Sequence, residues 1–231
     1  MKKEKMSSDY MILQFVVLLF FIGIIWFWGL FKVEADIYQG DVYRILYIHV
    51  PSAFASFLCS FLLFLQSVYY LIKRKLWLSY YMQSTAEVGL LFTMLTLVTG
   101  AIWGKATWGV WWTWDARLTT TFILALLYCG FLLLWTTVED FDHKLKCSSV
   151  LGVVIFSDIP IIYKSVTWWR TLHQPPSILG DQGTTMSPEI LSLLFTSSFI
   201  TFILSVWLIK QRSSNLALQS KIEKQWGTLL I

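Results

Sequence analysis

Six long apolar stretches constrain this chain more than any other feature of its sequence. They occupy residues 11–31, 45–72, 85–103, 118–138, 149–166 and 189–209. Each approaches or exceeds the roughly 20 apolar residues that a helix needs to cross the hydrocarbon core of a bilayer. The sequence therefore predicts an all-α integral membrane protein with six transmembrane helices. The connections are too short for a separate folded unit, so we expect residues 1–231 to form a single membrane domain.

The composition agrees with a membrane protein and excludes several functions. Hydrophobic residues make up 56% of the chain and charged residues 14%, whereas a soluble domain carries about 25% charged residues. The net charge of +4 comes without a long basic run, so no nucleic acid is expected as a partner. The three cysteines form no CxxC pair and indicate packing residues. We expect no enzyme, because no nucleophilic triad or carboxylate pair gathers on one side.

Lysine and arginine set the orientation of the predicted helices. Most of them lie in both tails and in the second and fourth connections: Lys2, Lys3, Lys5, Lys73, Arg74, Lys75, Lys144, Lys146, Lys210, Arg212, Lys221 and Lys224. Positive residues concentrate on the cytoplasmic side of membrane proteins. We therefore predict that both the N and the C terminus are cytoplasmic, and an even number of spans agrees because it places both termini on the same side.

Tryptophan is concentrated on the predicted outer side. Nine of the 13 tryptophans fall there, namely Trp26, Trp28, Trp103, Trp108, Trp111, Trp112, Trp114, Trp168 and Trp169. Five of these belong to the external segment of residues 103–120, WGKATWGVWWTWDARLTT. An anchoring belt would divide tryptophan about evenly between the two interfaces. The excess indicates a flat apolar partner, although an amphipathic helix lying at the outer interface would have a similar composition.

Charged residues near this segment offer a polar complement to the aromatic faces. Asp115 and Arg117 follow the tryptophans, and Arg44 precedes the second span. A planar macrocycle with two carboxylates could stack on the indoles while Arg44 or Arg117 meets a carboxylate. Each arginine could equally anchor its helix by reaching the lipid head groups.

Two of the three histidines flank the tryptophan-rich segment. His49 and His173 both fall on the predicted outer side, whereas His143 lies among acidic residues of a cytoplasmic connection. Two histidines beside a broad aromatic surface suit the axial ligation of haem iron. A bare metal ion is also a partner for neutral imidazole, but it would leave the aromatic surface unexplained.

These segments carry a resemblance to a known family. The string WGVWWTWDARLT resembles the tryptophan-rich signature of the WWD family of haem-handling proteins in cytochrome c maturation. The stretches RILYIHVPSA and WWRTLHQP resemble the segments that carry the outer histidines of that family. Six spans fit its small member in the System I pathway.

The resemblance implies particular roles for these residues. His49 and His173 would be the axial ligands of haem iron. The platform for the haem edge would consist of Trp108, Trp111, Trp112, Trp114 and Asp115. Haem b would bind transiently at the outer face and pass to a periplasmic haem chaperone. Subunits of an ATP-binding-cassette transporter would be further partners, in a bacterial inner (plasma) membrane or, alternatively, a mitochondrial inner membrane.

Two other functions are weighed against haem delivery. A membrane cytochrome b-like protein for electron transfer would retain its haem and place histidine pairs inside the bundle, but no histidine lies in the inner half of a span. A small-molecule permease would show repeat symmetry between its halves, which is not evident.

At the cytoplasmic end, we expect Glu87 to pair with Arg74 or Lys75.

Overall fold

The computed structural model describes residues 2–36, 39–174 and 186–229. Its helices are α1 (Lys2–Phe31), α2 (Leu46–Lys73), α3 (Leu78–Trp108), α4 (Ala116–Thr137), α5 (Phe141–Trp168) and α6 (Pro188–Leu229), with a short 3-10 helix, η1 (Asp41–Ile45), before α2. Six helical segments are long and apolar enough to cross a membrane, and the described residues form no extended strand. The predicted fold class is confirmed.

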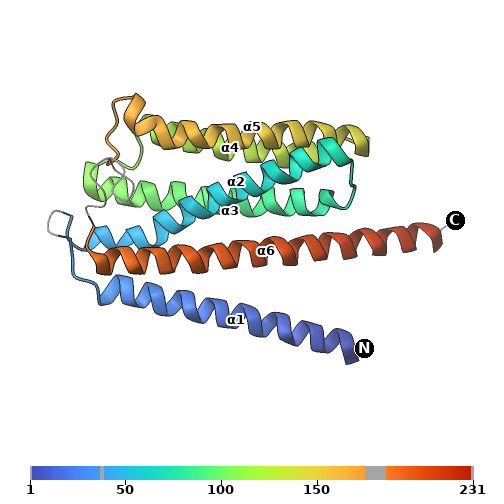
Figure 1. The fold of residues 1–231 in the computed structure, drawn as a ribbon, viewed down its shortest axis with the longest axis horizontal. Helices are drawn as coiled ribbons and strands as arrows, with labels where there is room; N and C mark the ends of the chain where they lie inside the picture. Colours follow the sequence, from blue (N-terminus) through green and yellow to red (C-terminus); the bar gives the residue numbers. More distant parts are fainter. Residues whose placement is uncertain (1, 37–38, 175–185, 230–231) are drawn as a thin grey trace.

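The connections sort into two ends of the bundle (Figure 1). Both chain termini lie at one end, together with the α2–α3 and α4–α5 connections. The ends of α1, α3 and α5 and the starts of η1, α4 and α6 lie at the opposite end, which we call the outer end. The basic residues used to predict the orientation therefore share one end of the molecule, which the positive-inside rule assigns to the cytoplasm.

Four helices extend well beyond the predicted apolar spans. Helix α1 begins before residue 11, α3 begins before residue 85 and continues to Trp108, α5 begins before residue 149, and α6 continues past residue 209 to Leu229. The apolar pattern ends where a helix leaves the hydrocarbon, but the backbone continues to satisfy its hydrogen bonds within the helix in water. The 42 residues of α6 span roughly 60 Å, about twice the thickness of the hydrocarbon core.

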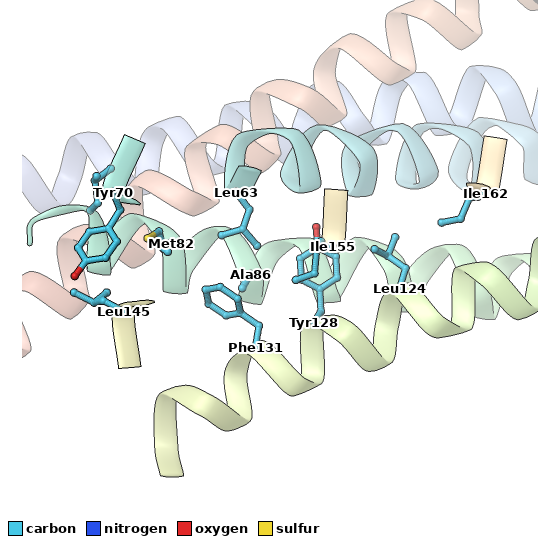
Figure 2. Packing of buried hydrophobic residues seen from close by; sticks show 11 residues of the cluster. Leu63, Tyr70, Met82, Ala86, Leu124, Tyr128, Phe131, Leu145, Ile155 and Ile162 are labelled. Atoms are coloured by element: carbon cyan, nitrogen blue, oxygen red, sulfur yellow. The ribbon is translucent and has the colours of Figure 1, made fainter. Parts of the chain in front are cut away.

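Helix α2 lies at the centre of the bundle and packs against α3, α5 and α6. The largest buried apolar cluster joins α2, α3, α4 and α5 and includes Leu63, Met82 and Tyr128 (Figure 2). Glycine brings α3 and α4 close together, because a Cβ atom added at Gly89 would lie 2.4 Å from Cζ of Tyr128. The Tyr128 hydroxyl is 2.8 Å from Oγ of Ser60 on α2, so three helices meet at this ring.

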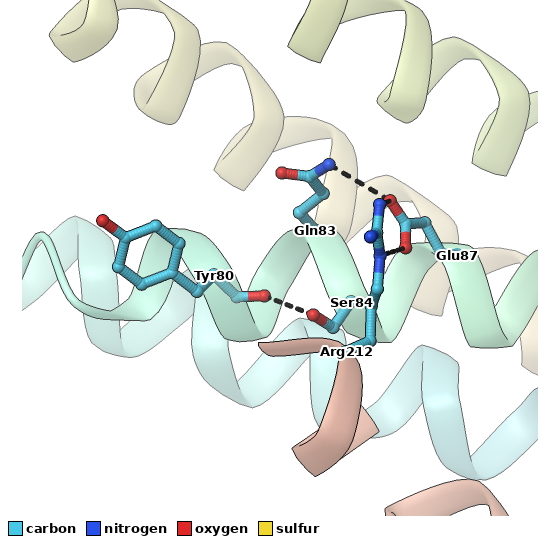
Figure 3. A network of polar contacts seen from close by, with 5 residues as sticks. All are labelled: Tyr80, Gln83, Ser84, Glu87 and Arg212. Atoms are coloured by element: carbon cyan, nitrogen blue, oxygen red, sulfur yellow. Dashed lines mark hydrogen bonds and ion pairs between the residues drawn. The ribbon is translucent and has the colours of Figure 1, made fainter. Parts of the chain in front are cut away.

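The cytoplasmic part of α6 is joined to α3 by an ion pair (Figure 3). Arg212 donates from Nε to Oε2 of Glu87 at 2.5 Å and from Nη2 to Oε1 at 3.0 Å. The predicted partners of Glu87 were therefore wrong. Arg74 instead ends α2 in a left-handed conformation with its guanidinium over the Tyr70 ring. The extension of α6 past its predicted end is what brings Arg212 beside α3.

Replacing Gly89 with alanine should destabilise the bundle by about 1–3 kcal/mol, because the added methyl group overpacks a buried ring. Gly130→Ala is the matched control, since a Cβ atom there would meet only Leu151 Cδ2, at 3.8 Å. Both changes gain the same helix propensity. Thermal unfolding in detergent should show a lower Tm for Gly89→Ala than for Gly130→Ala, and equal Tm values would contradict the described packing.

Candidate functional site

A cavity of about 820 Å³ lies at the outer end of the bundle. Its wall is built from the α1–η1 connection, η1, α2, α3, α4, the end of α5, the following connection and the start of α6. Phe54, Phe57 and Leu97 contribute apolar surface, while the same wall includes His49 and His173. A volume of this size falls within the range of roughly 300–1,000 Å³ typical of sites for small molecules and cofactors.

His49 belongs to the first turn of α2 and is held against α3. Its Nδ1 lies 3.0 Å from Oγ1 of Thr99. The Thr99 hydroxyl donates its only proton to the carbonyl of Leu95 at 2.6 Å, so its oxygen must accept from His49. The neutral imidazole therefore carries its proton on Nδ1 and keeps the lone pair of Nε2 free.

The surface of α3 fits closely around the His49 ring. Trp103 meets it edge to face, with ring centroids 5.6 Å apart. A Cβ atom at Gly100 would lie 3.0 Å from Cε1 of the imidazole, a distance tighter than almost all real contacts. Thr99, Gly100 and Trp103 thus fix the ring by a hydrogen bond, by the absence of a side chain and by aromatic packing.

His173 reaches the same cavity from the connection that follows α5. Its Nδ1 lies 3.0 Å from the carbonyl oxygen of Gln174. A carbonyl only accepts, so Nδ1 carries the proton and Nε2 is again unprotonated. Burial lowers the pKa of His173 below its usual value and the positive charge of Arg117 lowers it further, against smaller opposing effects of Gln174 and Asp115. The ring is therefore neutral at physiological pH, and it packs edge to face on Trp108.

The structure divides the predicted tryptophan platform. Trp108 lines the cavity, as does Trp103, which the sequence placed in the cluster but not in the site. Trp111 and Trp114 are 59% and 73% exposed, and Trp112 packs edge to face on Trp114. None of these three lines the cavity.

The reason for this division is the end of α3. The helix stops at Trp108, and Gly109 follows in a left-handed conformation. The chain then has no helical structure until α4 begins at Ala116. The helical side that Trp108, Trp111 and Trp112 were expected to share is therefore not formed.

Asp115 is buried at the start of α4 and does not line the cavity. Its Oδ1 accepts from the backbone amide of Arg117 at 3.0 Å and so caps the helix. Its Oδ2 accepts from the Thr171 hydroxyl at 2.5 Å and from the Leu172 amide at 2.8 Å. Burial alone would raise the pKa of Asp115, but these three hydrogen bonds and the nearby His173 outweigh it and lower the pKa. The carboxylate is ionised.

The two candidate arginines occupy different environments. Arg117 lines the cavity and donates to the Tyr163 carbonyl at 3.2 Å, while its buried Nε has no hydrogen-bond partner among the described residues. Arg44 does not line the cavity. It donates instead to the carbonyl oxygens of Leu30 at 2.7 Å and Val33 at 2.9 Å, and thereby ties the end of α1 to η1.

Sequence reasoning missed the residues that hold the histidines in place. Thr99, Gly100 and Trp103 share one face of α3, and a helical projection of that span could have suggested a surface for His49. Thr171 lies two residues before His173, but only the folded chain brings it to Asp115.

The fold and cavity together define a class of protein: a six-helix membrane protein with two outer histidines on one tryptophan-lined cavity. Comparison with known families agrees with this class. The family described as heme exporter protein C matches residues 2–228. The chain belongs to this family, and the resemblance seen in the sequence is confirmed.

Individual relatives come from bacteria and from plant mitochondria. Heme exporter protein C of Haemophilus influenzae is 37% identical over 89% of this chain and 82% of its own length. The Escherichia coli K12 protein of the same name is 35% identical over 89% of this chain and 83% of its own length. A putative ccmC-like mitochondrial protein for cytochrome c biosynthesis in Marchantia polymorpha is 38% identical over 77% of this chain and 79% of its own length.

Family membership establishes the general role. The chain is a membrane protein of a heme exporter family, with a role in haem handling for cytochrome c maturation. The bacterial and mitochondrial relatives agree with the two membranes predicted from the sequence.

The described hydrogen bond predicts the tautomer of His49. In protein labelled with ¹⁵N-histidine, the wild-type His49 ring should carry its proton on Nδ1, and Thr99→Val should reduce that tautomer because the acceptor is lost. Thr136→Val is the control, since among the described residues that hydroxyl bonds only within its own helix. The ¹⁵N signal that disappears in His49→Gln is the signal of His49. A wild-type His49 protonated on Nε2 instead would contradict the geometry.

Proposed function

We propose that this protein binds haem b transiently in the outer cavity, with His49 and His173 as axial ligands, and delivers it to a periplasmic haem chaperone. The observation that carries the proposal is that two outer histidines, from segments far apart in the sequence, line one cavity, and that the hydrogen bonds of their Nδ1 atoms leave both Nε2 atoms unprotonated. Nε2 of a neutral imidazole is a normal ligand of haem iron. Haem is here the cargo, and it supplies the iron that the imidazoles bind.

The walls of the cavity suit a planar apolar ring. Trp103 and Trp108 stand beside the two imidazoles, and indole faces pack well on extended aromatic systems. Apolar residues such as Phe54 and Phe57 cover deeper parts of the wall. This combination of ring-sized apolar surface and imidazole donors supports haem as the ligand in preference to a bare metal ion. No group of three or more metal-binding side chains gathers among the described residues.

Arg117 suits the carboxylate tails of haem. Its Nε lacks a partner among the described residues, and its Nη1 faces His173 Nδ1 at 3.5 Å, which already carries a proton. A guanidinium with unused donors in a cavity wall favours a carboxylate, which it can bind through two parallel hydrogen bonds. Within the proposal, Arg117 therefore contacts a propionate, and Arg44 contributes to the fold.

The tryptophans outside the cavity keep a predicted role in transfer. Trp111, Trp112 and Trp114 lie on the segment that leaves α3 directly after the cavity residue Trp108. We propose that they contact the haem edge as it passes to the chaperone. Binding must be strong enough to hold the ring and weak enough to release it. A ligand carried by a connection, as His173 is, supports such exchange better than two ligands on rigid helices.

The distribution of histidine disfavours the electron-transfer alternative. The chain has three histidines, and His143 is exposed in the first turn of α5 at the cytoplasmic end. No second histidine pair is available to carry another haem across the bilayer. Delivery also accommodates the expected partners, namely the chaperone, the subunits of an ATP-binding-cassette transporter and the lipid bilayer.

The ligands can be tested by removing each histidine. Purified protein should show a haem Soret band, and His49→Ala or His173→Ala should shift or weaken the band and abolish loading of the chaperone. His143→Ala should behave as the wild type because it lies at the other end of the bundle. An unchanged spectrum together with full loading in both outer variants would refute the assigned ligands.

The propionate contact can be tested with the ligand as well as the protein. Hydrogen bonds to charged groups contribute about 1.5–3 kcal/mol, so the wild type should bind haem at least about tenfold more tightly than haem dimethyl ester, whose carboxylates are masked. Arg117→Gln should lose this preference. Lys105→Gln should keep it, because Lys105 donates to the Gly109 carbonyl and does not line the cavity. An unchanged preference in Arg117→Gln would rule out the contact.

A further inference from the structure

We infer that Asp115 acts on haem binding through His173: its carboxylate holds the segment Thr171–His173 against the start of α4 and so positions the imidazole. In this role Asp115 is a positioning residue and does not touch the haem. The inference rests on the proposed ligation by His173, and it assigns the carboxylate of the tryptophan-rich signature a function different from that of a platform residue.

A chain of hydrogen bonds links the carboxylate to the histidine. Oδ2 of Asp115 accepts from the Thr171 hydroxyl at 2.5 Å and from the Leu172 amide at 2.8 Å. The Thr171 oxygen in turn accepts from the backbone amide of His173 at 3.0 Å. Three consecutive residues of the connection are thus fixed by one carboxylate oxygen and the hydroxyl that it holds.

The other carboxylate oxygen fixes Asp115 itself. Oδ1 accepts from the Arg117 amide at 3.0 Å in the first turn of α4. An N-cap hydrogen bond of this kind stabilises a helix by about 1 kcal/mol. It also holds the side chain in one orientation, because both oxygens are engaged. The connection is therefore attached to the first turn of a helix.

The segment around His173 depends on this support. Helix α5 ends at Trp168, and residues 169–174 are not helical. Between described residues, the hydrogen bonds that tie Thr171 or Leu172 to another helix reach only Asp115. Leu172 is itself 55% exposed, so burial of its side chain adds little to hold the segment.

Direct contact between Asp115 and haem is disfavoured on two grounds. The side chain is absent from the cavity wall, and the residue is only 7% exposed. Its carboxylate is ionised, so it would repel the propionates of haem at close range. The same negative charge strengthens the hydrogen bonds that it accepts from Thr171 and Leu172.

We call the hydrogen bonds from Thr171 and Leu172 to Asp115 the brace. The experiment separates the effect of the brace from that of the helix cap at the start of α4. Thr171→Val removes the hydroxyl but leaves the cap of α4 intact, and Thr171→Ser restores a hydroxyl at the same place. Asp115→Ala removes both the cap and the brace. Asp140→Ala is the matched control, because Asp140 caps α5 through the His143 amide at the cytoplasmic end. The readout is the optical and electron paramagnetic resonance spectrum of ferric haem bound to the full-length purified protein.

The expected results distinguish loss of one ligand from loss of the cavity. Thr171→Val and Asp115→Ala should keep haem through His49 but convert six-coordinate low-spin haem to the five-coordinate high-spin form, to the extent seen in His173→Ala. Added imidazole should restore the low-spin spectrum in all three. Thr171→Ser and Asp140→Ala should match the wild type.

Two results would overturn the inference while the proposed ligation by His173 stands. One is a wild-type low-spin spectrum in Thr171→Val. The other is an Asp115→Ala protein that binds haem more weakly while its remaining haem stays low-spin, since that pattern indicates direct contact. If His173→Ala itself leaves the low-spin spectrum unchanged, the proposed ligation fails and the inference fails with it. A change in His173→Ala without a change in Thr171→Val refutes the brace alone.

Discussion

The hydrogen bonds made by the two Nδ1 atoms are the interactions on which the outer site depends. His49 donates to the Thr99 hydroxyl, whose proton is already committed to the helix backbone, and His173 donates to a carbonyl. In each case the partner fixes the tautomer and leaves Nε2 unprotonated, as the hydrogen-bond partners of ligating histidines generally do. Without these bonds the same two residues could present a protonated nitrogen to the cavity, and neither would be prepared to bind iron.

The two imidazoles are nevertheless supported in different ways. His49 stands on a long helix at the centre of the bundle and fits against a glycine of α3, so its position is tied to the packing of the whole molecule. His173 stands on a connection and is held through a few polar contacts around Arg117 and Asp115. One rigid and one adjustable ligand is an arrangement suited to holding a cargo and then releasing it.

Much of this arrangement could be predicted from the sequence, because apolar length and basic residues depend only on local pattern. The six helices and the outer placement of both histidines follow from those signals. The contacts between elements could not be predicted in the same way. Trp103 lines the cavity while Trp111 and Trp114 lie outside it. The reason is that α3 ends at Trp108, so the later tryptophans do not continue along the same helix. The pairing of Glu87 with Arg212 likewise depends on where α6 continues beyond its apolar span.

A density map of the haem-loaded protein tests the central claim most directly. The account predicts one haem inside the outer cavity, with iron between Nε2 of His49 and Nε2 of His173 and a carboxylate tail beside Arg117. A haem stacked outside the cavity on Trp111 and Trp114, or one whose iron is bound by neither histidine, would contradict it.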